Sequence, residues 1–238
     1  MENKEVKKGV FSFKQFCIHH DRCAMKVGTD SVLLGAWGCV GGKRILDIGT
    51  GSGIIALMAA QRNLEAMVLG IDIDEQAVLQ AQENVAESIY SKRIRCFSQN
   101  VMTFCQEEPF DAILCNPPFF TEDTLPDNTS RALARNSKSL PFPQLINKAA
   151  LLLNDNGRFS VIIPSSHMQD FVGLCLIEKL NLERRCIVRT KTNKPPRRVL
   201  LTFIKGQSER CIEQDLCLTN PDGSRTQEYI ELTKVFYL

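Results

Sequence analysis

The sequence predicts an α/β fold: a mostly parallel seven-stranded sheet that an antiparallel C-terminal hairpin closes, with helices on both faces. From residue 43 onward, short β-branched or apolar runs alternate with longer amphipathic runs. This alternation is typical of strands joined by crossover helices. After residue 181 two strand-like runs are joined by only six residues, TNKPPR. Because that connection is too short for a crossover helix, the two runs are expected to pair as an antiparallel hairpin.

The elements follow in a regular order. Each of the five parallel strands has four to six residues and ends in turn-forming or acidic residues; they are expected at 43–48, 66–71, 94–98, 110–115 and 158–163. Apolar residues with helical spacing predict helices over 53–62, 75–88, 143–153 and 166–180. The hairpin strands are expected at 182–190 and 198–205. The segment 119–143 is expected to be a long functional loop.

Composition limits the class of protein. A chain of 238 residues with 44% hydrophobic and 24% charged residues can bury a sizeable core, which excludes disorder and collagen. We expect one domain over 1–238, with residues 1–40 as an N-terminal extension and 209–238 as a tail outside the core. No stretch reaches the roughly 18 apolar residues of a membrane span, so a cytoplasmic location without a membrane partner is expected.

Charge and cysteine content exclude two further interpretations. The formal net charge of +2 is too balanced to indicate a polyanionic partner, so only a local cluster of charge can do so. The ten cysteines form no CxxC pair, and Cys17 and Cys23, as close as any two, are separated by five residues. Neither a disulfide framework nor a zinc site fits this spacing, so reduced thiols and no metal are expected.

The first strand is followed by a glycine-rich turn, DIGTGSG. Gly49, Gly51 and Gly53 can adopt positive φ and let the backbone approach a ligand closely. A dinucleotide fingerprint counted from Gly49 would need a small residue where Ile54 stands, which weighs against NAD. No Lys followed by Ser or Thr comes after the loop, so it is not a P-loop.

Acidic residues next to this loop indicate the kind of ligand. Asp47 would repel a pyrophosphate but suits a ligand that carries an amino group, such as S-adenosylmethionine. Asp72, 25 residues later at the end of the second strand, is placed to accept both ribose hydroxyls. Asn100 is a candidate acceptor for the adenine amino group, and Asp74 is expected to cap the next helix. Singly these are ordinary turn and cap residues, but together they follow one sheet edge, where ligands of open α/β sheets bind.

The fourth strand ends in Asn116-Pro117-Pro118-Phe119-Phe120. The two prolines remove two N–H donors, so carbonyls in this turn are free to accept hydrogen bonds. The oxygen of Asn116 adds another acceptor and Phe119 a stacking surface. These groups suit a planar exocyclic amine, which must be held with nitrogen aimed at a methyl donor and needs no strong base before attack. The alternative is an ordinary Pro-Pro turn at the end of a core strand.

The order DIGTGSG, GIDID, NPPF resembles class I S-adenosylmethionine-dependent methyltransferases with a Rossmann-like fold, in the branch that methylates planar nitrogens. The blocks FKQFCIHHDRCAMKVGTDSVLLGAW, RRVLLTF and QEYIELTKVFYL resemble the bacterial family that modifies adenine 37 of valine tRNA at N6. This resemblance spans nearly the whole chain. It implies S-adenosylmethionine as cofactor, the tRNA anticodon loop as partner and no obligate protein partner.

The resemblance also implies roles for single residues. Lys26, Gly28, Thr29 and Asp30 belong to the segment that folds over the methionine end of the cofactor. Asp47, Gly49, Gly51, Gly53 and Asp72 match the cofactor motif, and Asn116, Pro117, Pro118 and Phe119 the catalytic one. Two positions depart from the family pattern: many members have Tyr in place of Phe119, which keeps the stacking surface, and Asp in place of Asn100, which puts the adenine contact in doubt.

Two basic segments flank the predicted reaction centre. Residues 184–208 contain eight Lys and Arg and no acidic residue. Residues 128–154 contain Arg131, Arg135, Lys138 and Lys148, again with no acidic residue. A solvated basic surface is the alternative interpretation of each segment. Because both segments flank the site, we expect phosphate contacts from Arg131, Arg135, Lys194, Arg197 and Arg198.

Three functions remain open from the sequence. The first is N6-methylation of an adenine in the anticodon loop of a tRNA. The second keeps the chemistry but changes the acceptor to guanine N2 in ribosomal RNA or to a glutamine amide in a protein. The third is a nucleotide-binding module without catalysis.

Overall fold

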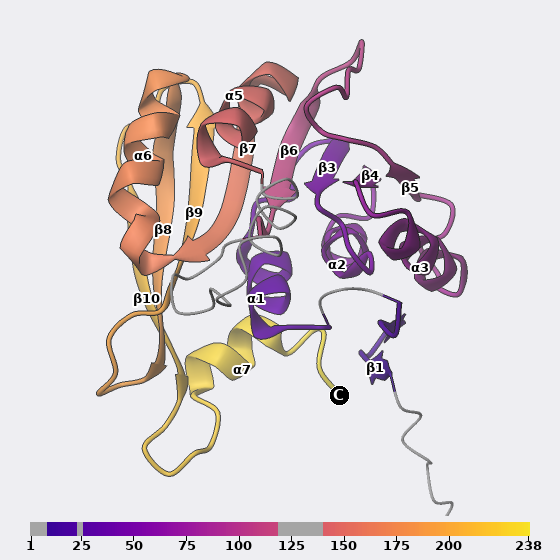
Figure 1. Ribbon diagram of the computed structural model, residues 1–238. Coiled ribbons are helices and arrows are strands. Elements are labelled where there is room, and N and C mark those ends of the chain that lie inside the picture. The colour runs from indigo at the N-terminus through magenta and orange to yellow at the C-terminus, as the bar shows by residue number, and fades with distance from the viewer. Residues whose placement is uncertain (1–8, 23–25, 119–139) are drawn as a thin grey trace, which may run out of the picture.

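An eight-stranded sheet forms the centre of the molecule (Figure 1). The computed structural model describes residues 9–22, 26–118 and 140–238. The strand order is β10-β8-β9-β7-β6-β3-β4-β5. Every neighbouring pair is parallel except β7 with β9 and β8 with β9. The predicted α/β class and the antiparallel hairpin are confirmed.

The strands and helices are close to those predicted. The sheet strands are β3 (Arg44–Ile48), β4 (Met67–Asp72), β5 (Ile94–Ser98), β6 (Phe110–Cys115), β7 (Leu153–Pro164), β8 (Leu180–Lys191), β9 (Arg198–Lys205) and β10 (Ile212–Thr219). A separate small ribbon pairs β1 (Val10–Ser12) with β2 (Cys17–His19). The helices are α1 (Thr29–Trp37), α2 (Ile54–Arg62), α3 (Glu75–Ala86), α5 (Phe142–Leu152), α6 (Met168–Ile177) and α7 (Gln227–Thr233), with a 3₁₀ turn at Ser165–His167.

Helices cover both faces of the sheet, as Figure 1 shows. One core lies under α1, α2, α3 and α7, where Leu33, Leu57 and Phe236 are almost fully buried. The other lies under α5 and α6 and contains Phe159, Phe171 and Phe203. Alternate residues of each central strand contribute to opposite cores; Ile45 faces the first and Leu46 the second. This explains why the central strands are apolar throughout.

The predicted count of seven strands and the placement of 209–238 outside the core are wrong. Residues 212–219 form β10, which pairs in parallel with β8 and extends the sheet at that edge. The following helix α7 packs on β10 and α1. Tyr229 and Phe236 from this C-terminal part are buried in the first core.

The topology brings the predicted site residues to one edge. The parallel strands end at Ile48, Asp72, Ser98 and Cys115, so their carboxyl ends lie together. Because β9 runs the opposite way, its first residue Arg198 lies beside Pro164 at the end of β7. The turns that follow β8 and β10 lie at this same edge. We call it the carboxyl edge.

Three general features concern the described residues only. All nine described cysteines are free thiols. In that part of the chain, no cluster of three His, Cys, Asp or Glu side chains is arranged to hold a metal ion. None of the helices described there is both long and apolar enough to cross a membrane.

Candidate active site

The glycine-rich turn between β3 and α2 has the backbone conformation that its sequence predicts. Gly49, Gly51 and Gly53 have φ of 72°, 53° and 81°, a region that L residues with side chains rarely adopt. A Cβ on Gly49 or Gly51 would meet no atom within 4 Å, so both face open space. Gly53 instead faces Ala81 of α3, where a Cβ would come within 3.2 Å. The first two glycines therefore leave room for a ligand, and the third allows close helix packing.

Asp72, at the end of β4, holds this turn in place. Its Oδ2 accepts the Gly51 N–H at 2.9 Å, and its Oδ1 accepts the Asp74 N–H at 3.0 Å. Each carboxylate oxygen keeps a further lone pair, and the side chain is half-buried. Asp72 is thus fixed next to Gly51 with acceptor capacity left, as ribose hydroxyls require. Asp74 caps α3, accepting from Gln76 and Ala77, which confirms that prediction.

Asp47 lies at the bottom of the site and is fully buried. Its Oδ2 accepts the hydroxyl of Thr50 at 2.7 Å, whereas its Oδ1 has no hydrogen-bond partner among the described residues. Burial, and to a smaller extent the charge of Asp72, raises the pKa of Asp47 from 3.8 to about 7. A buried carboxylate of this kind gains most from a positive charge placed beside it.

Asn116 presents an unused acceptor at the end of β6. Its Nδ2 donates to the hydroxyl of Ser31 at 3.2 Å. Its Oδ1 is buried and has no partner among the described residues. A buried carbonyl oxygen without a donor costs free energy, so it is expected to be satisfied by a ligand. Pro117 beside it is buried and Pro118 is exposed.

The start of α1 links the two predicted halves of the site. Ser31 contacts Asn116, and the preceding Asp30 pairs with Arg198 at 2.8 Å. Gly28 and Thr29, just before, are exposed, as is Lys26. The segment predicted to cover the cofactor therefore lies beside Asn116, the predicted catalytic residue, and is connected to β9.

Asn100 follows β5 and forms a turn. Its Oδ1 accepts the Met102 N–H at 2.9 Å, and its carbonyl accepts from Thr103 and Phe104. The side-chain oxygen predicted to meet adenine is thus already engaged, although it keeps one lone pair. The adenine contact stays a prediction.

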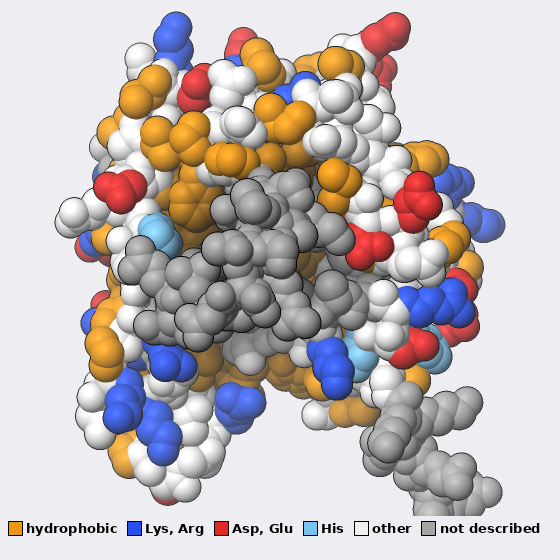
Figure 2. Space-filling model, in the orientation of Figure 1, with side chains coloured by type: hydrophobic (Ala, Val, Ile, Leu, Met, Phe, Trp, Pro, Cys, Tyr) orange, Lys and Arg blue, Asp and Glu red, His pale blue; other side chains and the backbone are white. Residues whose placement is uncertain are grey.

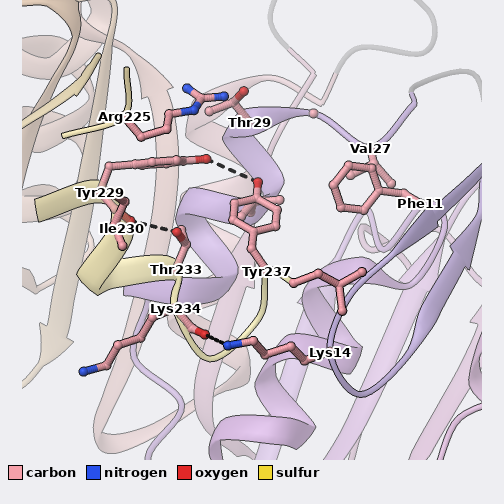
Figure 3. A pocket seen from close by; sticks show the side chains of 13 residues that line it. Phe11, Lys14, Val27, Thr29, Arg225, Tyr229, Ile230, Thr233, Lys234 and Tyr237 are labelled. Atoms are coloured by element: carbon pink, nitrogen blue, oxygen red, sulfur yellow. Dashed lines mark hydrogen bonds between the residues drawn. The ribbon is translucent and has the colours of Figure 1, made fainter. Parts of the chain in front are cut away.

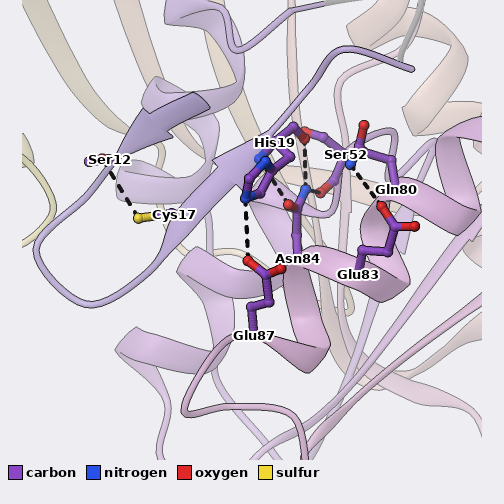
Figure 4. Close-up of polar contacts among 8 residues, drawn as sticks. All are labelled: Ser12, Cys17, His19, Ser52, Gln80, Glu83, Asn84 and Glu87. Carbon is purple, nitrogen blue, oxygen red and sulfur yellow. Dashed lines mark hydrogen bonds and ion pairs between the residues drawn. The ribbon is translucent and has the colours of Figure 1, made fainter. Parts of the chain in front are cut away.

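Sequence analysis did not single out Asn84, a buried residue of α3 that joins three segments (Figure 4). Its Oδ1 accepts the His19 N–H at 2.8 Å, while its Nδ2 donates to the carbonyls of His19 and Ser52. At the surface, His19 Nε2 lies 3.3 Å from a Glu87 carboxylate oxygen. Asn84 thereby attaches β2 to the glycine-rich turn. An Asn within a helical apolar pattern was the one available signal.

The predicted basic segment 184–208 is partly neutralised within the fold. Arg185 and Arg189 pair with Glu213 and Asp215 of β10. Arg184 lies over the Trp37 ring at 4.2 Å, and Lys205 donates to two carbonyls of the α5–β7 region. The exposed cations that remain lie at the end of β8 and in the turn between β8 and β9: Lys191, Lys194 and Arg197. Figure 2 shows blue side chains gathered there, at the lower left.

Three predicted site residues lie outside the described residues: Phe119, Arg131 and Arg135. The remaining predicted residues converge on the carboxyl edge.

Residues 28–174, which include the glycine-rich turn and Asn116, match the sequence model of the family described as methyltransferase small domain. A protein of Phocaeicola vulgatus described as tRNA1(Val) (adenine(37)-N6)-methyltransferase is 45% identical over 96% of this chain and 97% of its own length. A protein of Tolumonas auensis with the same description is 44% identical over 96% of both chains. The chain belongs to the tRNA1(Val) (adenine(37)-N6)-methyltransferase family. The family predicted from the sequence motifs is confirmed, and the protein is an S-adenosylmethionine-dependent methyltransferase.

Solved structures support the fold of this methyltransferase. A predicted O-methyltransferase of Agrobacterium tumefaciens superposes with a TM-score of 0.66 at 18% identity, over 87% of this chain and 96% of that one. A putative RNA methyltransferase of Pyrococcus horikoshii superposes with a TM-score of 0.54 at 19% identity, over 75% of this chain and 82% of that one. At these identities the likeness establishes the Rossmann-like fold alone.

The residues present fit S-adenosylmethionine. The methyltransferase has open space over Gly49 and Gly51, and Asp72 keeps acceptor capacity beside it. Below the same turn, the buried Oδ1 of Asp47 has no hydrogen-bond partner among the described residues. A ligand with ribose hydroxyls and positive charge would satisfy each of these features.

Proposed function

We propose that the protein transfers a methyl group from S-adenosylmethionine to the N6 amine of adenine 37 in the anticodon loop of valine tRNA. The observation that carries the proposal is the buried Oδ1 of Asn116, which has no hydrogen-bond partner in the described ranges. It lies at the end of β6, beside the strand that leads into the glycine-rich turn. Relatives with near-complete coverage are described as acting on this nucleotide.

In this proposal Asn116 holds the acceptor amine. Its Oδ1 accepts one N–H of the adenine amine, and a carbonyl of the Pro117-Pro118 turn accepts the other. Ser31 accepts from the Asn116 Nδ2 and thereby fixes which end of the amide faces the amine. Bound S-adenosylmethionine supplies an electrophilic methyl group on a positively charged sulfur. Fixing the amine so that its nitrogen points at that carbon lowers the barrier without a general base.

The proposed substrate explains the chemistry of the carboxyl edge. An adenine must leave the stacked loop to reach Asn116, and phosphate contacts on either side would hold the RNA while it does so. Lys194 and Arg197 are exposed at this edge. Such a reaction belongs to the cytoplasm, where tRNA is modified.

The first test is the identity of the methylated molecule. The protein is incubated with S-adenosylmethionine carrying a labelled methyl group and with tRNA from cells that lack the protein. Nucleosides are then analysed by mass, with total protein and ribosomal RNA as parallel acceptors. Label in N6-methyladenosine of tRNA supports the proposal. Label in ribosomal N2-methylguanosine or in protein glutamine assigns the alternative acceptors, and binding of S-adenosylmethionine without transfer to any fraction indicates a binding module.

A further inference from the structure

A pocket of about 600 Å³ lies between the N-terminal segment, the start of α1 and helix α7 (Figure 3). Its walls come from parts of the chain far apart in sequence: Phe11 and Lys14, then Gly28 and Thr29, then Arg225 and the residues of α7. Of the predicted site residues that the structure describes, only Gly28 and Thr29 line it. The other lining residues have no assigned role.

The pocket combines aromatic rings with cations. Arg225 lies over the ring of Tyr229, 4.9 Å from its centre, and the hydroxyls of Tyr229 and Tyr237 share a 3.2 Å hydrogen bond. Phe11 and Tyr237 add ring surface, their centres 6.0 Å apart. Figure 3 shows Arg225 reaching toward Thr29 on one side and Lys14 on the other side of the pocket.

The charges of the pocket are unbalanced. Lys234 pairs with Glu231, but within the described ranges no carboxylate pairs with Lys14 or Arg225. Lys14 Nζ donates one hydrogen bond, to the carbonyl of Lys234 at 2.6 Å, and so keeps two donors. An apolar ligand would leave both cations without a counter-charge. An anion with a planar aromatic group would use the cations and the rings together, as single-stranded nucleic acid does.

The pocket adjoins the reaction centre. Thr29 lines it, and Ser31, in the same turn of α1, contacts Asn116. The turn after β10 that carries Arg225 lies at the carboxyl edge, because β10 runs parallel to β8. A strand of RNA whose base reaches Asn116 therefore passes close to this pocket.

We propose that this pocket binds a nucleotide of the substrate RNA that is near the methylated adenosine in the strand. Lys14 and Arg225 contact its phosphates, and Phe11 and Tyr237 offer ring surface to its base. This inference rests on the proposed function, since it takes RNA as the substrate.

The test measures RNA binding of Lys14→Ala, Arg225→Ala and the double variant over a series of KCl concentrations. Valine tRNA transcribed in vitro is the probe, and Lys92→Ala is the control because Lys92 is exposed just before β5, at the opposite edge of the sheet. Each single variant is expected to reduce the slope of log K against log salt by about 0.7, the value for one phosphate of a single strand. The KM for tRNA rises, while kcat at saturating tRNA and the affinity for S-adenosylmethionine stay at the wild-type values.

The outcomes separate this inference from the proposed function. Slopes equal to that of Lys92→Ala overturn the inference even if the wild-type protein methylates valine tRNA normally. Weaker S-adenosylmethionine binding with unchanged tRNA binding would assign the pocket to the cofactor and also overturn it. If the wild type methylates no tRNA, the proposed function fails, whatever the slopes. Lys14→Arg and Arg225→Lys, which keep the charge, are expected to keep the salt slope and exclude a folding defect.

Discussion

The two ends of the Asn116 amide have different environments, and this difference predicts the effect of removing it. The Nδ2 is held by Ser31, but the buried Oδ1 has no donor among the described residues. If Oδ1 binds the amine mainly in the transition state, Asn116→Ala lowers kcat by about 100-fold or more. The dissociation constant of S-adenosylmethionine, measured by calorimetry, stays close to that of the wild type.

Asp72→Ala is the matched comparison for Asn116→Ala. Asp72 fixes the Gly51 N–H and is placed to accept ribose hydroxyls, so its removal weakens S-adenosylmethionine binding. An Asn116 variant that loses cofactor affinity and rate by equal factors would contradict the assigned role. Normal cofactor binding by Asp72→Ala would show that the ribose assignment is wrong.

Asp47 makes stability depend on pH. Burial raises its pKa to about 7 in the folded protein, against 3.8 when unfolded. Between these values the folded state holds a proton that the unfolded state has lost, so the free energy of unfolding falls as pH rises from about 4 to about 7. One group contributes at most about 1.4 kcal/mol per pH unit. Urea unfolding at a series of pH values, without cofactor, measures this slope.

Asp47→Asn is the control for that slope, because the amide is neutral at every pH and keeps the shape of the side chain. Its free energy of unfolding is expected to vary less between pH 4 and 7 than that of the wild type. The same slope in both proteins would show that other groups cause it.

At the level of elements, Asn84 attaches β2 and the glycine-rich turn to α3. Asn84→Ala leaves the His19 N–H and the carbonyls of His19 and Ser52 without their partner. We expect the free energy of unfolding to fall by about 2–4 kcal/mol, since several buried polar groups lose hydrogen bonds together. The control is Asn147→Ala, whose Nδ2 bonds Glu178 at the surface, with an expected change below about 0.5 kcal/mol. Equal losses in both variants would contradict the linking role.

The central strands could be predicted from the sequence because both of their faces are buried. The observed bounds of β6 and β9 are the predicted ones, since their apolar runs leave little choice of structure. The bounds of the edge strand β5, which has three exposed residues, also match the prediction. The strand β10 could not be predicted: its first four residues are exposed, three of them are polar, and Glu213 and Asp215 among them pair with arginines of β8. Such pairing becomes visible only once the register is known.

Residues 154–157, which separate the helix expected at 143–153 from the strand expected at 158–163, instead belong to the start of β7. Leu153 pairs with Phe110, and the register then shifts before Ala112 pairs with Arg158. Asn156 has φ of 62°, as an irregularity within a strand requires. Asn, Asp and Gly indicate such a bend but cannot distinguish a bulge from a turn between elements.

At the level of the whole molecule, long-range contacts decide which cations face the solvent at the carboxyl edge. The sequence showed eight basic residues in one segment, but it could not show that β10 neutralises two of them or that Asp30, 168 residues away, pairs with Arg198. Conversely, Lys14 and Arg225 stand in segments that seemed to lie outside the core, and the fold brings them to one pocket.

Arg197 tests the role of this edge in RNA binding. It is exposed in the turn between β8 and β9. Arg197→Glu is expected to weaken tRNA binding. It should also reduce the slope of log K against log salt by about 0.7 to 0.9 for each lost phosphate contact. Arg210→Glu makes the same charge change between β9 and β10, at the opposite edge, and should leave the salt slope unchanged. The salt series used for the pocket variants measures both, and an unchanged slope in Arg197→Glu would count against phosphate contacts there.

In the proposed reaction Asn116 holds the exocyclic amine of adenine 37 toward the methyl group of S-adenosylmethionine. The most direct test of this reaction compares two valine tRNA transcripts that differ only at position 37, one with adenosine and one with inosine, which has no 6-amino group. Transfer of labelled methyl from S-adenosylmethionine is measured at saturating concentrations of each. We expect stoichiometric methyl transfer to the adenosine transcript and none to the inosine transcript. Equal transfer to both would show that the methyl group goes elsewhere and would contradict the proposed reaction.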